Sequence, residues 1–454
     1  MINLSKKNIV KVSNETGFIK DNVEKVMRLI DILETIFSSK WKDKLVLKGG
    51  TAINLFYADL PRLSVDIDMD YTGKTKEEML ADKEDFRDYL KSVLFQKGYS
   101  LSEASKTHYA LDSYVFQYIN NGGNKDNIKV ETNFMDRAHI LHDEKKTISA
   151  LDYDGNVEIS VMNKYELYGS KFAALIDRGK PRDIYDVSRA IDLGILDHSQ
   201  LLKKCFIFYN CIGDDASILD KNYTVIDEVT PRDFKTMLKP VLAKKEKFDY
   251  DAAKVKIKKF LDGLLIFSDS EKAFVEKFKE NEYKPELLFD TFDYSDIAVR
   301  VGWHPMAYWR CQITETEQGQ KQMDEALRIS ILMKERGIES ITSMSDRDVI
   351  ESAARLSKRH SNDFNDLYYG KNVYDNEDKN IRRLMVYLAA FCGDKERLLK
   401  IFKTSGQFNA DKPIEYYDKI AEEQIKFIKE IDKDNKVKHD TSSNFSQKHF
   451  GKSK

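Results

Sequence analysis

Two aspartates separated by a single residue constrain this chain more than any other feature. They lie in the run Leu63-Ser64-Val65-Asp66-Ile67-Asp68-Met69-Asp70, in which apolar and acidic residues alternate. Alternation with a period of two is typical of a strand, so Asp66 and Asp68 project from the same face. Two carboxylates on one face are the outline of a divalent-metal site, although a solvated strand face explains an isolated Asp-x-Asp equally well.

A pair of glycines precedes this run, in the sequence Lys48-Gly49-Gly50-Thr51. The glycines stand between an apolar run at 45–47 and a helix-like run at 51–57. Glycines let backbone N–H groups approach a phosphate, with the N-terminus of the following helix behind them. The order of strand, glycine turn, helix and acidic strand therefore predicts one pocket for phosphates and a divalent metal.

Hydrophobic periodicity predicts a mixed sheet flanked by helices, followed by an almost entirely helical region from residue 164 onward. The predicted helices are 21–37, 51–57 and 76–96, and the predicted strands are 45–47, 65–70, 113–119 and 128–134. The last two strands are separated by Asn120-Asn121-Gly122-Gly123-Asn124, which is typical of a hairpin tip.

Composition limits the classes of protein to which this chain can belong. Its 454 residues predict two or three domains, and 74 basic against 76 acidic side chains leave no global field for nucleic acid, so any such binding needs a local patch. The four cysteines show no Cys-x-x-Cys spacing, which supports neither zinc nor a disulfide framework. With no apolar signal core and no run of 18 apolar residues, we expect a cytoplasmic protein without a membrane segment.

The glycine turn and the acidic strand together resemble the signature of the DNA polymerase β-like nucleotidyltransferase superfamily. More narrowly, Leu-Lys-Gly-Gly-Thr-Ala followed by Arg-Leu-Ser-Val-Asp-Ile-Asp resembles the AbiEii/AbiGii toxin family, which the long gap from Gly50 to Asp66 also suits. The stretches 283–289 and 304–309 look like the end of that family's domain, so the resemblance covers roughly residues 1–312. It implies an α+β fold, with a polymerase β-like mixed sheet, flanking helices and all-α regions after them.

We divide the chain accordingly into four parts. Residues 1–195 are the expected nucleotidyltransferase core and 196–312 the helical part of the AbiEii-like domain. After a polar linker at 312–320, residues 313–432 resemble the small helix bundles beside primase and helicase modules of phages and mobile elements. The lysine-rich tail, 433–454, has the composition of a disordered segment.

Asp66 and Asp68 are the expected metal ligands and catalytic residues, since nucleotidyl transfer uses two divalent ions held by carboxylates. Glu131 is central on a neighbouring predicted strand and is the candidate for a third ligand, although a solvent-facing strand residue is an equally good interpretation. Lys48, Gly49, Gly50 and Thr51 are the expected nucleotide-binding residues at the turn.

A second cluster lies in the helical sequence 165–186. Lys171 and Arg178 are two helical turns apart, so they share one side and could neutralise a triphosphate. Asp183 and Asp186 can point the same way from a helix start, or form an ordinary salt-bridged pair. The family resemblance implies that Lys171 and Asp183 complete the catalytic set and that Asp186 helps to bind the nucleotide.

Three further residues allow two interpretations each. Ser64, at a position where the family often has a serine, could touch the nucleotide or satisfy a backbone group. Arg62 could contact phosphate or anchor its loop. His304 invites a catalytic interpretation, but a histidine before proline and beside tryptophans is more typical of a packed structural residue.

The resemblance implies a toxin that uses an NTP with Mg²⁺ or Mn²⁺ and transfers NMP to an RNA acceptor, first of all the 3′ end of tRNA. It also implies an antitoxin encoded nearby and a role in phage defence. Two alternatives remain open. One is transfer of NMP to a protein hydroxyl, and the other is a non-catalytic, nucleotide- or DNA-associated module of a mobile element.

Overall fold

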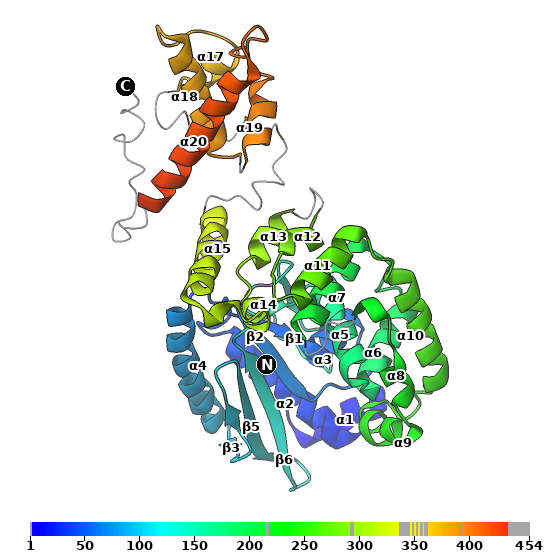
Figure 1. The fold of residues 1–454 in the computed structure, drawn as a ribbon. Helices are drawn as coiled ribbons and strands as arrows, with labels where there is room; N and C mark the ends of the chain where they lie inside the picture. The colour runs from blue at the N-terminus through cyan, green and yellow to red at the C-terminus, as the bar shows by residue number, and fades with distance from the viewer. Residues whose placement is uncertain are drawn as a thin grey trace. The chain divides into compact units, whose positions relative to one another are not determined.

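The computed structural model describes residues 2–213, 218–290, 295–335, 346, 349, 350, 353, 354, 357, 362–392 and 394–434. The chain forms two compact units (Figure 1). The first comprises residues 1–290 with 297–330, and the second comprises 291–296 with 331–454. None of the described helices is long and apolar enough to cross a membrane.

A single mixed sheet organises the first unit. Its strand order is β3-β5-β6-β2-β1-β8-β7, with β4 paired to β5. The pairs β2–β6 and β1–β8 are parallel and the other pairs are antiparallel. The strands are β1 (Leu45–Lys48), β2 (Asp66–Tyr71), β3 (Ser100–Leu101), β4 (Lys106–Thr107), β5 (Leu111–Ile119), β6 (Lys125–Asn133), β7 (Glu144–Thr147) and β8 (Glu158–Val161).

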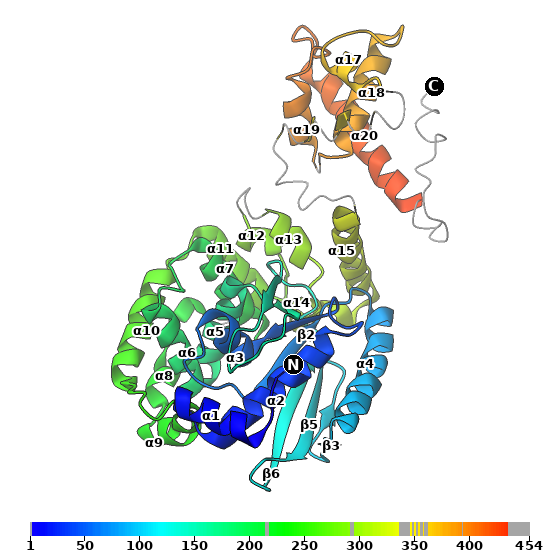
Figure 2. The same ribbon diagram turned by 180° about the vertical axis from the view of Figure 1, so that it is seen from behind.

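One face of this sheet is apolar and covered by the early helices. Ile67 and Met69 of β2 point to that face and are almost fully buried, as is Val130 of β6. Figure 2 shows α2 (Lys20–Phe37) across the sheet on this side and α4 (Lys76–Gln96) along its edge. The amphipathic stripe of α2 supplies the matching apolar surface, because its residues recur at three- and four-residue intervals.

Helices make up the rest of the first unit, and Figures 1 and 2 show α5, α6, α8 and α10 grouped on the side away from α4. Before the strands comes α1 (Lys6–Thr16), and α3 (Gly49–Ala52) continues into η1 (Ile53–Tyr57) between β1 and β2. After β8 follow α5 (Lys164–Arg178), α6 (Pro181–Asp192), α7 (Gln200–Ile212), η2 (Ile218–Asp220), α8 (Thr224–Glu228), α9 (Pro231–Asp233), η3 (Phe234–Leu238), η4 (Lys239–Val241), α10 (Tyr250–Leu264), α11 (Asp269–Lys279), α12 (Pro285–Leu288), α13 (Ser295–Val301), α14 (Pro305–Arg310), η6 (Ile313–Glu315) and α15 (Glu317–Glu335).

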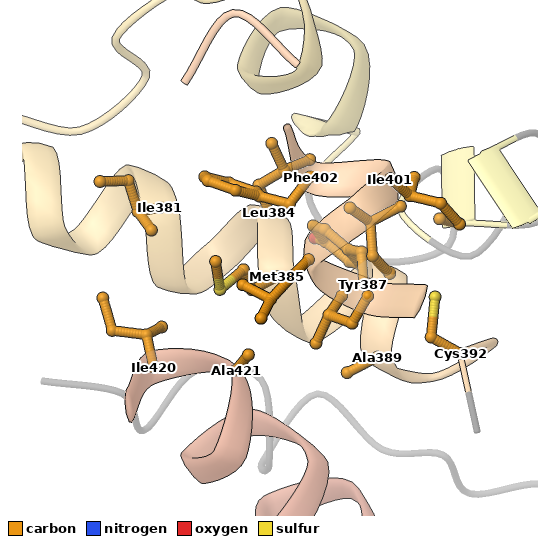
Figure 3. Close-up of a cluster of buried hydrophobic side chains, with 14 of the residues drawn as sticks. Ile381, Leu384, Met385, Tyr387, Ala389, Cys392, Ile401, Phe402, Ile420 and Ala421 are labelled. Atoms are coloured by element: carbon orange, nitrogen blue, oxygen red, sulfur yellow. The ribbon is translucent and has the colours of Figure 1, made fainter. Parts of the chain in front are cut away.

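The second unit is helical and has a core of its own. Its described helices are α17 (Phe364–Tyr368), α18 (Glu377–Ala389), α19 (Lys395–Phe402) and α20 (Ile414–Asp434). Figure 3 shows Leu384 and Met385 of α18 packed among side chains of α19 and α20, including Phe402 and Ile420. Each of these four residues is at most 1% exposed, so the unit buries a continuous apolar cluster.

The predicted fold class is confirmed, with a mixed sheet, flanking helices and helical regions after it. The helix at 76–96 has the predicted bounds, and the hairpin tip at 120–124 joins β5 to β6. The predicted linker at 312–320 is wrong, because η6 and the first residues of α15 occupy it. The four domain boundaries and the likeness of the helix bundle stay predictions, and the predicted tail lies outside the described residues from 435 onward.

Candidate active site

The predicted carboxylates lie on the polar face of the sheet, opposite the face covered by α2. In the register of β2 and β6, Asp66 stands beside Lys129 and Asp68 beside Glu131. Residues paired across neighbouring strands point to the same face, so Glu131 joins the two aspartates there. On the other side of β2, Lys48 of β1 is paired with Asp68.

The glycine turn presses directly against these side chains. Gly49 has a φ of +71°, and a Cβ built on it would lie 2.4 Å from Oδ2 of Asp68. A Cβ on Gly50 would lie 2.9 Å from Oγ of Ser64 and 2.9 Å from a guanidinium nitrogen of Arg62. Gly49 combines a left-handed conformation with a close approach to Asp68, so glycine is strongly favoured there, whereas a side chain at Gly50 would displace the ends of the Arg62 and Ser64 side chains.

An open cleft of about 330 Å³ lies over this part of the sheet. Its floor comes from β1, β2 and β6, and its opposite wall comes from α5. The lining residues are Lys48, Gly49, Asp68, Met69, Leu111, Glu131, Asn133, Leu167, Ser170, Lys171, Ala174 and Arg178. The fold thus brings both parts of the predicted site, which are about 100 residues apart in sequence, into one cleft.

Asp68 occupies an environment with unbalanced negative charge. Its pKa is raised to about 6, first by burial and then by the charges of Asp66 and Glu131, which Lys48 and Lys171 oppose only in part. Among the described residues, no three His, Cys, Asp or Glu side chains are already gathered at metal-binding spacing. A hard divalent cation would relieve the repulsion, and carboxylate oxygens are suitable ligands for it, so this donor set fits such an ion.

Lys171 reaches the cleft from α5 and is held by carboxylates of α6. Its Nζ lies 3.0 Å from Oδ1 of Asp183 and 3.3 Å from Oδ2 of Asp186. Burial works against the charged ammonium, but these two carboxylates outweigh it and raise the pKa of Lys171. Arg178 places Nε 3.0 Å from Oδ2 of Asp183, and its side chain remains half-exposed. Asp183 therefore bridges the two basic residues of the wall.

Asp186 lies behind the cleft, where it anchors the loop before β2. Arg62 donates from Nε and from a terminal nitrogen to the two carboxylate oxygens of Asp186, both at 2.7 Å. Both side chains are buried. A bidentate arginine–carboxylate pair fixes both distance and orientation. This geometry supports the anchoring interpretation of Arg62. It connects the loop before β2, the strand that carries Asp66, to α6, whose carboxylates form ion pairs with Lys171.

A second buried network, which the sequence analysis did not find, holds Lys48. Its Nζ lies 2.5 Å from Oδ1 of Asp70 and 3.2 Å from Oδ2 of Asp136. Burial opposes the charge on Lys48, but these carboxylates raise its pKa. Nε2 of His139 lies 3.1 Å from Oδ2 of Asp70. Asp70 is third in the alternating acidic row, which was a signal for its inward position, but no sequence pattern indicated its partners.

The remaining predicted residues have local roles in the structure. Thr51 donates its hydroxyl to the backbone carbonyl of Asp66, which ties the helix after the glycines to the acidic strand. His304 is fully buried and caps α14, where Nδ1 accepts a hydrogen bond from the backbone N–H of Ala307. Burial lowers the pKa of His304 to about 4, so it is neutral at physiological pH. These contacts support the structural interpretation of His304.

The mixed sheet presents carboxylates beside a glycine turn, which is the arrangement that the sequence predicted for a nucleotidyltransferase. The family described as nucleotidyl transferase AbiEii toxin, of a type IV toxin–antitoxin system, matches residues 31–260, which is half of the chain. The chain belongs to this AbiEii family of nucleotidyltransferase toxins. The family resemblance inferred from the sequence is therefore confirmed.

Several solved structures match the chain, among them one at low sequence identity. MenT4, a nucleotidyltransferase toxin from Mycobacterium tuberculosis H37Rv, aligns with a TM-score of 0.46 and 12% sequence identity. The alignment covers 72% of this chain and 99% of that one. None of the curated proteins compared with the chain matches it.

Proposed function

We propose that this protein transfers NMP from an NTP to an RNA acceptor, with the 3′ end of tRNA as the first candidate. The observation that carries the proposal is the cleft in which Asp68 and Glu131 face Lys171 and Arg178. Negative charge on one wall suits divalent ions, and positive charge on the other suits phosphates. Family membership supports NTP as the substrate and an antitoxin as a partner, which we expect to be encoded nearby.

Each residue has a separate task in this proposal. Backbone N–H groups of Gly49 and Gly50 approach the triphosphate, and Ser64 and Thr51 support that turn. Lys171 and Arg178 act as fixed positive charges on the phosphates, oriented by Asp183. Asp66, Asp68 and Glu131 would hold Mg²⁺ or Mn²⁺, which when bound neutralises charge on the attacking and leaving oxygens.

The transfer is a displacement at the α-phosphorus of the NTP. A hydroxyl oxygen of the acceptor forms a bond to this phosphorus, and the bond to the oxygen bridging the α- and β-phosphates breaks. Pyrophosphate leaves with the electron pair, and the hydroxyl proton passes to water. Charge accumulates on the departing phosphates, so Lys171 and Arg178 contribute most when that charge develops.

The test is to incubate the purified full chain with each α-labelled NTP, MgCl₂ or MnCl₂, and total RNA or cell lysate. We expect label on ribonuclease-sensitive material, and Asp66→Ala or Asp68→Ala should lower the rate about a thousandfold or more. The control is Asp88→Ala, because Asp88 is an exposed aspartate on α4. A cleft variant within tenfold of the wild-type rate would refute the metal-site assignment.

The same experiment distinguishes the alternatives. Label on protease-sensitive material would indicate transfer to a protein hydroxyl, and no label with any NTP would favour a non-catalytic module.

Lys171→Ala should weaken NTP use without abolishing binding of the metal alone, because lysine acts on phosphates as a point charge. Arg178→Ala should give a milder defect, since its side chain is half-exposed.

A further inference from the structure

The segment 230–247, which we call the basic segment, carries an excess of positive charge at the surface of the first unit. It contains six basic and two acidic residues, whereas the whole chain has a formal net charge of −2. All six basic side chains belong to exposed residues. They are Arg232, Lys235, Lys239, Lys244, Lys245 and Lys247.

The two acidic residues of the segment are engaged in local structure. Asp233 forms a capping box with Thr230, whose backbone N–H donates to the carboxylate at 2.9 Å. Glu246 accepts a hydrogen bond from the hydroxyl of Tyr185 at 3.2 Å. Within the described part of the chain, none of the five lysines of the segment forms an ion pair. By contrast, Lys258 on the nearby α10 lies 2.8 Å from Asp227.

The backbone of the basic segment is fixed in place. Phe234, Leu238 and Val241 are buried, so one side of the segment packs on the protein. Lys244 donates its backbone N–H to the carbonyl of Gly17 at 2.9 Å. The charges are thus presented by an ordered surface, which lowers the entropic cost of binding a ligand.

This segment adjoins the residues just before the N-terminal end of β2, the acidic strand. The backbone N–H of Leu63 donates to the carbonyl of Val241 at 2.8 Å, and Leu63 precedes Asp66 by three residues, about 10 Å of extended chain. Arg182 connects the two from the side, because its Nε donates to the carbonyl of Met237 at 2.9 Å. Burial lowers the pKa of Arg182, and the negative charge of Asp66 opposes this lowering. The basic segment therefore lies beside the part of the chain that leads into Asp66.

We infer that the basic segment binds the sugar-phosphate backbone of the RNA acceptor and leads its reactive end toward Asp66. The inference rests on the proposed function. Several exposed lysines without ion-pair partners suit a ligand with repeated phosphates, and such contacts position a nucleic acid without reading its sequence. The NTP needs only the cleft, so the basic segment affects the acceptor and not the nucleotide.

The test compares two triple variants of the full chain. Lys235→Gln/Lys239→Gln/Lys245→Gln removes three charges from the segment, and Lys125→Gln/Lys279→Gln/Lys284→Gln removes three exposed charges from other elements. Binding of a labelled 20-nucleotide single-stranded RNA is measured by anisotropy across a salt series. Binding of a fluorescent NTP analogue with MgCl₂ is measured in parallel.

We expect the segment variant to bind RNA at least tenfold more weakly at low salt, with the slope of log affinity against log salt reduced by about 2. The control variant should stay within threefold of the wild type, and all three proteins should bind the NTP analogue equally. Equal losses in both variants, an unchanged slope, or a wild type that binds anionic vesicles or acidic peptides in preference to RNA would overturn the inference.

The result separates the inference from the proposed function. Asp68→Asn should abolish transfer and leave RNA binding intact. If no acceptor is labelled but RNA binding depends on the segment, the proposed reaction is wrong and the surface assignment stands. If RNA is labelled and the segment variant keeps the wild-type KM for RNA, the reaction stands and the surface assignment is wrong.

Discussion

At the scale of residues, the aspartates of β2 show how environment separates identical side chains. Asp70 is buried and lies within ion-pair distance of Lys48 and His139. Asp68, two residues earlier on the same face, stands near Asp66 and Glu131, and its pKa is raised to about 6. Removing one partner of a paired buried carboxylate is strongly destabilising, whereas an unbalanced carboxylate with a perturbed pKa is typical of functional sites.

Asp68→Asn should therefore raise the Tm by a few degrees at pH 7 in EDTA, as expected for about 1 kcal/mol. The pKa of Asp68 in the folded protein lies above its ordinary value of 3.8, so stability is lost as the pH rises from about 3.8 to about 6, and the loss is complete above about pH 6. The difference between variant and wild type should shrink as the pH falls from 7 toward 4. Thermal unfolding at several pH values measures it.

Asp70→Asn is the matched control for this prediction, with the opposite sign. It leaves Lys48 and His139 without their shared carboxylate, so we expect a loss of about 3–5 kcal/mol. MgCl₂ should stabilise the wild type more than Asp68→Asn. A lower Tm for Asp68→Asn in EDTA would show that Asp68 is not under net repulsion.

At the scale of elements, the site depends on how closely the turn between β1 and α3 approaches β2. Gly49 adopts a left-handed conformation at a point where a Cβ would lie 2.4 Å from Oδ2 of Asp68. Gly98, at the end of α4, has a similar φ of +83°, but a Cβ there would meet nothing within 4 Å. The two glycines therefore share the backbone requirement and differ only in the close contact.

Gly49→Ala and Gly98→Ala should each lose about 1–2 kcal/mol of stability through the left-handed conformation. Only Gly49→Ala should also lose transfer activity, about a hundredfold or more, because the new Cβ displaces Asp68. Chemical denaturation and the transfer rate measure the two effects. Equal activity of the two variants would mean that the position of Asp68 does not limit the reaction.

At the scale of the whole molecule, the chain divides into two units with separate cores. The first unit holds every residue of the proposed site. The core of the second unit consists of buried residues from its own helices, among them Leu384, Phe402 and Ile420. Units with their own cores can usually fold alone.

A fragment of residues 331–434 should therefore unfold cooperatively when heated. Leu384→Ala should destabilise it by about 2–5 kcal/mol, because Leu384 is completely buried. A chain ending after Ser330 should keep metal-dependent transfer. The two measurements are circular dichroism of the fragment and the transfer rate of the shortened chain. Loss of transfer on shortening would mean that the second unit is needed for catalysis.

The sequence by itself determined the features that depend on local geometry. The alternation in β2 predicted that Asp66 and Asp68 share a face, because successive side chains of a strand point to opposite sides. The glycine pair predicted a turn at which backbone N–H groups can approach a phosphate, and the two-turn spacing predicted that Lys171 and Arg178 face one side. These predictions needed no information about contacts between residues that are distant in the sequence.

Only the tertiary structure decided which charges meet. Arg62 pairs with Asp186 across 124 residues, and Lys48 with Asp136 across 88 residues. The basic segment likewise lies beside the chain that enters the acidic strand, where Val241 accepts a hydrogen bond from Leu63. No periodicity encodes such partners, because buried ion pairs form wherever the packing of distant elements brings opposite charges together.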